Sequence, residues 1–194
     1  MTSSSRPQPK LFFWERDYAR KLPDGKHLTA LRRGLGRDPG DVPAMWPYYT
    51  RLRSDGWVSS DLRAEHAALV LFAVHQQSQP RLVHRPGVGL GTAVAKLRLD
   101  GKFSVDAVDR RFGAAATATS FPEVVAHLRS MVSQLRSLTV TPPLDYTKLF
   151  RDLCDWQDAD RAHQVRRRWG AQYFTARDIV NEASTPQDLE ISQP

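Results

Sequence analysis

Cysteine and long apolar runs are nearly missing from this chain of 194 residues. Its one cysteine, Cys154, cannot form an internal disulfide, so the fold must depend on a packed core. The longest apolar run, Ala67 to Val74, is far too short to cross a bilayer. Residues 1–10 contain no apolar segment of the kind that a secretory signal needs. We therefore expect a soluble protein of the cytoplasm that has no membrane partner.

Lysine is scarce relative to arginine, and acidic residues are fewer than basic ones. The 28 basic residues comprise 22 Arg and 6 Lys against 21 acidic residues, which gives a net charge of +7. Arginine pairs with phosphate through two N–H groups and also stacks on bases. A GC-rich genome would raise the share of arginine, but it does not explain the excess of positive charge. That excess favours an anionic partner such as nucleic acid.

The motifs of common enzymes and metal sites are also missing. None of the six histidines has a cysteine or carboxylate partner at metal-ligand spacing, and neither HExxH nor CxxC occurs. Residues 87–91 (GVGLG) resemble a nucleotide-binding loop only in glycine content, because no strand precedes them. We interpret these glycines as allowing the loop to lie close to a helical bundle. We expect no cofactor, no metal and no catalytic residue.

Apolar residues recur at helical spacing almost throughout, and no hairpin pattern recurs. Trp14, Tyr18 and Leu22 lie four residues apart and predict a first helix. Residues 61–77 carry a wide apolar stripe that predicts a long helix. Leu90, Val94 and Leu97 predict a shorter one. The sequence therefore predicts an all-α fold.

Capping residues mark the start of two further helices. Ser120 and Glu123 form a capping box around Pro122, whose missing N–H costs nothing in a first turn. From Val124 to Leu138, apolar residues repeat at intervals of 4, 3, 4 and 3, a seam typical of a helical bundle. Asp145 is the predicted cap of the next helix.

Loops rich in Pro and Gly divide the chain at residues 36–47, 76–91 and 139–144. The middle loop is the expected seam between two packed helical units. The predicted organisation is a disordered tail at 1–9, an N-terminal helical unit at 10–88, a C-terminal helical bundle at 89–183 and a disordered tail at 184–194.

Arginines recur beside the apolar faces of several predicted helices. Arg110 and Arg111 lie on the helix after Ser104, and two later helices each carry arginines seven residues apart on one side. Charges on one helix are usually only its solvated face, but their recurrence on three helices favours a groove for a phosphate backbone. The candidate nucleic-acid-binding residues are Arg32, Arg33, Arg110, Arg111, Arg129, Arg136, Arg161 and Arg168.

One pattern suggests an enzyme. Six residues separate Arg20 from His27, which fits a loose Arg-x(4–6)-His pattern found in helical ribonucleases of the higher-eukaryote-and-prokaryote nucleotide-binding type. In those enzymes both residues come from one helix. Here residues 23–25 (PDG) should break the helix between them. The pattern therefore remains only an alternative.

Three segments together resemble the CasB family, the small subunit of the type I-E CRISPR complex called Cascade. The first is ALRRGLGRDPG at residues 30–40, followed by MWPYY at 45–49. The second is HRPGVGLGTA at residues 84–93. The third pairs Asp152-Leu153-x-x-Trp156 with a basic and aromatic ending at residues 168–174. The order and spacing of these segments carry the resemblance, which covers residues from about 10 to 175.

The resemblance implies an all-helical, non-catalytic subunit present as two copies in a larger ribonucleoprotein. Its implied partners are other Cascade subunits, the crRNA, the displaced non-target DNA strand and a second copy of itself. Carried over by position, the residues that grip the strand are Arg33, Arg110, Arg111, Arg129 and Arg161. Another hypothesis is a protein-interaction subunit that has no direct DNA contact.

Overall fold

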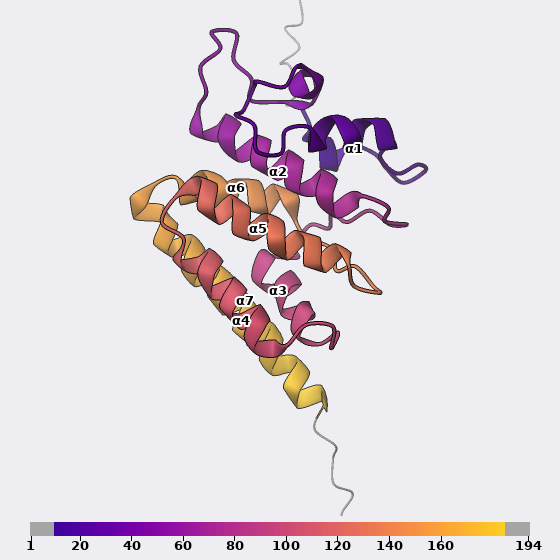
Figure 1. Ribbon diagram of the computed structural model, residues 1–194, viewed down its shortest axis with the longest axis vertical. Helices are drawn as coiled ribbons and strands as arrows, with labels where there is room; N and C mark the ends of the chain where they lie inside the picture. The colour runs from indigo at the N-terminus through magenta and orange to yellow at the C-terminus, as the bar shows by residue number, and fades with distance from the viewer. Residues whose placement is uncertain (1–9, 185–194) are drawn as a thin grey trace, which may run out of the picture.

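The structure is a computed structural model that describes the backbone of residues 10–184 and the side chains of residues 10–176. In this part of the chain, seven α-helices and three short 3-10 helices are joined by loops (Figure 1). The all-α prediction is confirmed, and the β-type pairing among the described residues is one isolated bridge, His84 to Leu144. The elements are η1 (Phe13–Glu15), α1 (Gly25–Arg32), η2 (Pro43–Tyr48), α2 (Ser60–Gln76), α3 (Leu90–Ala95), η3 (Lys96–Arg98), α4 (Val105–Thr117), α5 (Phe121–Arg136), α6 (Tyr146–Trp156) and α7 (Ala159–Ser184).

Helix α2 is enclosed by its neighbours. Figure 1 shows it between α1 above and α5 and α6 below, and it packs against all three. The predicted long helix is confirmed, and Ser59 caps it by accepting a hydrogen bond from the Leu62 amide. Every residue from Ala64 to Gln76 is buried, so the helix is enclosed on all sides and not along one stripe only. A helix that is apolar all round is stable only inside a core.

The buried carboxylate of Glu65 holds the loop that follows η2. It accepts hydrogen bonds from the amide of Thr50 (2.7 Å), from the Thr50 hydroxyl (2.6 Å) and from the amide of Arg51 (2.9 Å). Burial raises the pKa of Glu65, although these three bonds act in the opposite direction. The bonds tie residues 50 and 51 to the central helix.

The predicted first helix is wrong. Only Phe13–Glu15 forms a 3-10 turn, and residues 16–24 contain no helix. Trp14 is fully buried, and its Nε1 donates to Thr147 Oγ1 over 2.9 Å, while the Thr147 hydroxyl donates to Glu15 over 2.5 Å. These contacts with α6 offset the lost helical hydrogen bonds. The burial of Trp14 therefore reflects a tertiary contact, which periodicity cannot distinguish from a helix.

The two predicted caps are confirmed, although the Glu123 carboxylate of the predicted capping box accepts from the amide of Thr119 (2.8 Å). The Ser120 hydroxyl accepts from the Glu123 amide at the start of α5, and the Asp145 carboxylate accepts from the Lys148 amide at the start of α6. Each bond satisfies one amide that has no partner within its own helix. The α5 seam is also confirmed, because Val124, Leu128, Met131, Leu135 and Leu138 are all buried.

The glycine segment 87–91 lets α3 lie directly against α7. A Cβ at Gly91 would lie 2.2 Å from the carbonyl oxygen of Trp169 and 2.6 Å from the amide nitrogen of Tyr173. A Cβ at Gly89 would lie 2.2 Å from the side-chain oxygen of Gln172. Gly91 is therefore needed for the close packing of α3 on α7, which agrees with the predicted role of these glycines, whereas at Gly89 the flexible end of Gln172 could move aside.

The predicted seam between residues 88 and 89 stays a proposal. It falls at Gly89, the N-cap of α3, and buried side chains on both sides of it belong to one cluster.

Residues 1–9 and 185–194 of the predicted tails lie outside the described part, and Ser184 ends α7. None of the helices between residues 10 and 184 combines the length and apolarity that a membrane crossing requires.

The imidazole of His75 is completely buried near the end of α2. Its Nδ1 lies 3.0 Å from the hydroxyl oxygen of Tyr146. Desolvation, assisted by the positive charge of Arg136, lowers the pKa of His75 to about 3. Protonation therefore occurs far more readily in the unfolded chain, where the pKa is about 6.5.

We expect the free energy of unfolding to fall as the pH is lowered from 7 to 5. The unfolded state binds the extra proton in this range, so His75 alone contributes a loss of about 2 kcal/mol. Burial also lowers the pKa of His66 and His84, which adds to the loss in the same direction. Urea unfolding at both pH values measures it. In His75→Asn the difference should shrink by about 2 kcal/mol, and an unchanged difference would contradict the assignment.

Candidate nucleic-acid interface

Helix α4 presents the clearest pair of candidate residues. Arg110 and Arg111 are both exposed, and neither has a hydrogen-bond or ion-pair partner among the described residues. The opposite side of the helix is buried through Val108 and Phe112. Val105, the first residue of the helix, is 41% exposed. The guanidinium groups of this pair are available to an anion.

Helix α5 carries two candidate arginines whose surroundings differ. Arg129 is exposed and has no ion-pair partner in the described part of the chain. Arg136 is half-buried and donates to the Val74 carbonyl (3.4 Å) and to Gln77 Oε1 (2.6 Å), which holds α5 against the end of α2. Although both lie on one helix, only Arg129 has a guanidinium that is free for a ligand.

At the junction of α6 and α7, the candidate arginines are paired with carboxylates. Arg161 contacts Asp155 (3.0 Å) and Asp158 (3.1 Å). Arg168 contacts the buried Asp152 at 2.5 Å and lies 4.0 Å from Asp155. A phosphate would have to compete with these carboxylates, so this part of the surface is a weaker anion site than the helical pattern suggested.

The remaining candidates end helix α1. Arg32 is half-buried and donates to the Thr29 hydroxyl over 3.2 Å, whereas Arg33 is exposed at the C-cap. The chain then enters the glycine- and proline-rich segment 34–39. This segment folds back onto α2, because His66 Nε2 lies 3.0 Å from the Gly34 carbonyl oxygen. His66 Nδ1 also lies 2.7 Å from the Tyr49 hydroxyl oxygen, so two contacts hold the imidazole in place.

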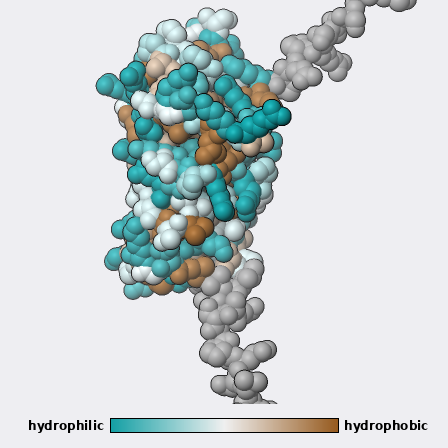
Figure 2. All heavy atoms as spheres, turned by 90° about the vertical axis from the view of Figure 1, so that its right-hand side faces the viewer, coloured by the Kyte–Doolittle hydropathy of each residue, from teal (hydrophilic) through white to brown (hydrophobic). Residues whose placement is uncertain are grey.

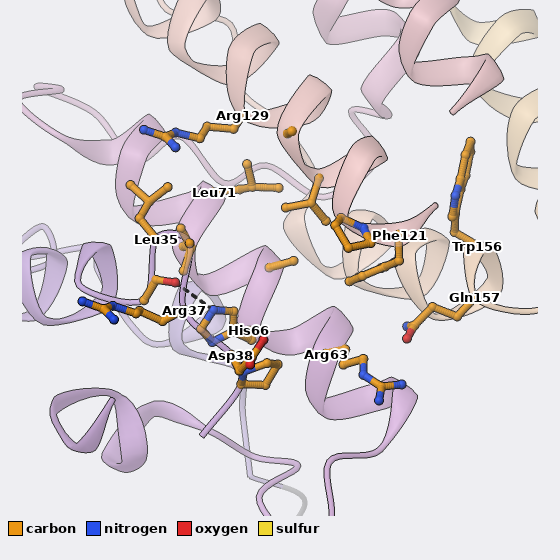
Figure 3. Close-up of a pocket in the computed structure, with 18 of the residues that line it drawn as sticks. Leu35, Arg37, Asp38, Arg63, His66, Leu71, Phe121, Arg129, Trp156 and Gln157 are labelled. Atoms are coloured by element: carbon orange, nitrogen blue, oxygen red, sulfur yellow. Dashed lines mark hydrogen bonds between the residues drawn. The ribbon is translucent and has the colours of Figure 1, made fainter. Parts of the chain in front are cut away.

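This folding creates a groove of about 990 Å³, which we call the α2–α5 groove. Figure 3 shows its lining: Leu35, Leu71 and Phe121 lie in the middle, and the side chains of Arg37, Arg63 and Arg129 lie around them. One wall is segment 34–39, the second is α2, the third is the start of α5, and the turn from α6 to α7 closes one end. The groove thus brings together four parts of the chain that are distant in sequence.

Sequence reasoning found Arg129 but missed Arg37 and Arg63. Arg37 lies in a loop whose position on α2 no periodicity could reveal. Arg63 lies on the helix that the sequence marked as apolar, where it is an exposed charge in the first turn, directly before the fully buried part. The only usable signal was their charge, which was not distinctive among 28 basic residues.

The ribonuclease geometry is not present. Arg20 lies in the non-helical segment before α1, and His27 lies in the first turn of α1 after the Asp24 cap. The Nδ1 atom of His27 lies 2.7 Å from the hydroxyl oxygen of Tyr48. The two residues therefore do not share a helix, as predicted, although the reason is that α1 begins only at Gly25 and no helix contains Arg20.

The cysteine, the possible metal ligands and the tryptophans were also considered as functional groups. Burial, with a contribution from Asp61, raises the pKa of Cys154 to about 12, so its thiol stays protonated. No group of His, Cys, Asp or Glu among the described residues is arranged to hold a metal ion. Trp14, Trp156 and Trp169 are buried, while Trp46 and Trp57 are 50% and 68% exposed.

These features define an all-helical protein whose chemically distinctive groups are exposed arginines. The family model of the CRISPR-associated protein Cse2 matches residues 27–174, most of the chain, so the chain belongs to this family and the resemblance is confirmed. CasB from Thermobifida fusca is 28% identical, with a TM-score of 0.60 over 77% of this chain and 84% of that one.

Two further solved structures are similar. A chain of a CRISPR RNA-guided surveillance complex is 27% identical, with a TM-score of 0.62 over 84% of this chain and 89% of its own length. M. ruber CasB shares the fold with a TM-score of 0.67 at 22% identity, over 87% of this chain and 94% of that one. The comparison with curated proteins gave no match.

Proposed function

We propose that this chain is a non-catalytic small subunit of a type I-E Cascade surveillance complex and that it holds the displaced DNA strand. The observation that carries the proposal is the set of exposed arginines on α4 and α5 that have no described partner, in a chain of the Cse2 family. Its similarity to a chain of an RNA-guided complex supports partnership with other subunits and crRNA. A second copy of the chain would extend the basic surface.

The proposed physical role is to shift, by a small amount of free energy, the balance between closed duplex DNA and the opened state with an RNA–DNA hybrid. Replacing a DNA duplex by an RNA–DNA hybrid is nearly neutral in free energy, so modest contacts to the displaced strand decide whether the open state persists. Phosphate contacts do not read sequence, which suits a subunit that must accept any target. Arg110, Arg111 and Arg129 have the exposure that such contacts require.

We expect single-stranded DNA to bind the purified chain in a salt-sensitive manner. Four or five phosphate contacts give a slope of log K against log salt of roughly −3, which weakens binding about 60-fold between 50 and 200 mM salt. Arg110→Gln combined with Arg111→Gln should reduce the slope to roughly −1.5 and this loss to about 10-fold. Fluorescence anisotropy of a labelled oligonucleotide across a salt series measures both.

The matched control is Arg20→Gln combined with Lys21→Gln. This second pair is also adjacent, exposed and without a described partner, and its replacement removes the same charge. It should leave the slope near that of the parent if the α4 pair makes specific phosphate contacts. Equal slopes for the two double variants would mean that only net charge matters. Loss of RNA over time, abolished by His27→Ala, would instead establish the ribonuclease.

A second candidate function is protein binding through exposed apolar side chains. Trp46, Leu52 and Trp57 are 50%, 43% and 68% exposed, and all three follow α1 and precede α2. Figure 2, which shows one face of the molecule, has its hydrophobic residues in small patches among hydrophilic ones. Absence of oligonucleotide binding, together with tight association with other Cascade subunits, would favour this function.

A further inference from the structure

The α2–α5 groove combines an apolar interior with a basic edge. Leu71 of α2 and Phe121 and Val125 of α5 line its middle. Arg37, Arg63 and Arg129 are exposed, and no described residue pairs with them. They come from a loop and from two helices, so positive charge approaches the groove from different sides (Figure 3). A ligand that fills it would need apolar surface and negative charge within one short segment.

The groove is also firmly built. Its fourth arginine, Arg166, donates to the Ala118 carbonyl over 3.0 Å, and its guanidinium carbon lies 4.8 Å from the centre of the Trp156 ring. The opposite wall is held by the contact of His66 with Gly34. Because these walls are fixed before a ligand arrives, little ordering cost remains at binding.

We propose that the α2–α5 groove binds the unpaired bases of single-stranded nucleic acid, while Arg37, Arg63 and Arg129 hold the flanking phosphates. A strand places a charged phosphate beside every flat, mostly apolar base, which matches an apolar groove with arginines at its edge. The volume of about 990 Å³ lies at the upper end of the range for small-ligand sites and exceeds what one base needs. In a duplex the bases face each other and cannot enter.

This inference rests on the proposed function and adds a distinct element to it. Strand holding through phosphates alone depends on charge, so it does not require bases. Occupation of the groove requires bases that are free of a partner strand. The subunit would then recognise the displaced strand as single-stranded, without reading its sequence.

An acidic peptide with apolar side chains is the competing occupant. The groove favours nucleic acid for two reasons. The arginines outnumber the acidic residues, since Asp38 is the one carboxylate among the lining residues and four are arginines. The planar guanidinium of arginine also stacks on bases and pairs with phosphate through two N–H groups, so the same side chains suit both parts of a nucleotide.

The test compares two single-stranded DNA oligonucleotides of equal length and charge. One carries normal bases, and the other has abasic sites at consecutive central positions. We expect the purified chain to bind the abasic strand at least about tenfold more weakly in fluorescence anisotropy. The salt slopes should be similar, because both strands offer the same phosphates.

A groove variant provides the second arm. Ala126 is exposed on α5 and lines the groove, so Ala126→Leu partly fills the groove without altering charge or core. It should reduce the preference for normal bases while leaving binding of the abasic strand unchanged. Ala171→Leu, at an exposed position of α7 outside the groove, is the matched control and should retain the preference.

The outcomes separate this inference from the proposed function. Equal, salt-sensitive binding of both strands would overturn the inference and leave phosphate-based strand holding intact. Failure to bind either strand would count against both. The third outcome concerns an acidic peptide with apolar side chains as competitor. If it displaces a bound strand from the parent at a lower concentration than unlabelled strand does, and does not displace the strand from Ala126→Leu, the groove belongs to a peptide.

Discussion

Replacing Asp152 by alanine is expected to lower the free energy of unfolding by about 3 kcal/mol. The Asp152 carboxylate is 2% exposed and lies on α6. It accepts from Arg168 at 2.5 and 3.1 Å and from Trp169 Nε1 at 2.6 Å, so it joins α6 to α7. Alanine would leave the buried indole N–H and a half-buried guanidinium without their acceptor. The cost of leaving such groups unpaired exceeds the net gain from forming the bonds.

Urea unfolding followed by circular dichroism measures this effect. The matched control is Asp155→Ala on the same helix, which removes one acceptor of Arg161 at a half-exposed position and should change the midpoint far less, because solvent replaces the lost contact. Equal shifts for the two variants would show that Asp152 does not act as a buried link. Asp152 belongs to the Asp152-Leu153-x-x-Trp156 motif, one of the segments that carried the family resemblance. Its bonds to Arg168 and Trp169 give the aspartate of that motif a structural role.

Replacing Gly91 by alanine is expected to destabilise the fold by about 3 kcal/mol, at the upper end for overpacking. The added Cβ would lie 2.2 Å from one backbone atom of α7 and 2.6 Å from another. Backbone cannot swing away as a long side chain can, so α3 would have to move off α7. Differential scanning calorimetry and urea unfolding both report the loss.

Gly170→Ala is the matched control for this prediction. Gly170 lies within α7, and a Cβ there would meet nothing within 4 Å. Alanine favours the helix over glycine, so the same substitution should stabilise the protein by about 0.5–1 kcal/mol. A loss of stability in Gly91→Ala together with a gain in Gly170→Ala would establish that Gly91 is required for the close approach of α3 to α7. A loss of stability in both variants would contradict this account.

Helix positions that depend on local signals were predictable. The caps at Ser120 and Asp145 and the seam of α5 were correct because they depend on residues within a few positions of one another. The error at residues 14–22 has the opposite origin. There, Trp14 bonds to Thr147, a residue 133 positions away, and this contact replaces the helix that the spacing suggested.

For the arginines, too, some properties could be predicted from the sequence and others depended on tertiary contacts. Their number and their places on helices could be read from the chain, and so could the preference for an anionic partner. Which guanidiniums remain free could not, since it depends on contacts between elements. Arg136 is held by the end of α2 and Arg168 by Asp152, whereas Arg110, Arg111 and Arg129 have no described partner.

Short stretches of sequence therefore determined the helical class of the fold and the starts of several helices. They also showed that common enzyme motifs are missing and carried the family resemblance. Packing alone decided where the groove lies, because its walls come from residues 34–39, α2, the start of α5 and the turn into α7. Hydrogen bonds and hydrophobic burial between these distant elements set the surroundings of each arginine. Side-chain spacing along one helix carries no information about such contacts, so the α2–α5 groove became visible only in the folded molecule.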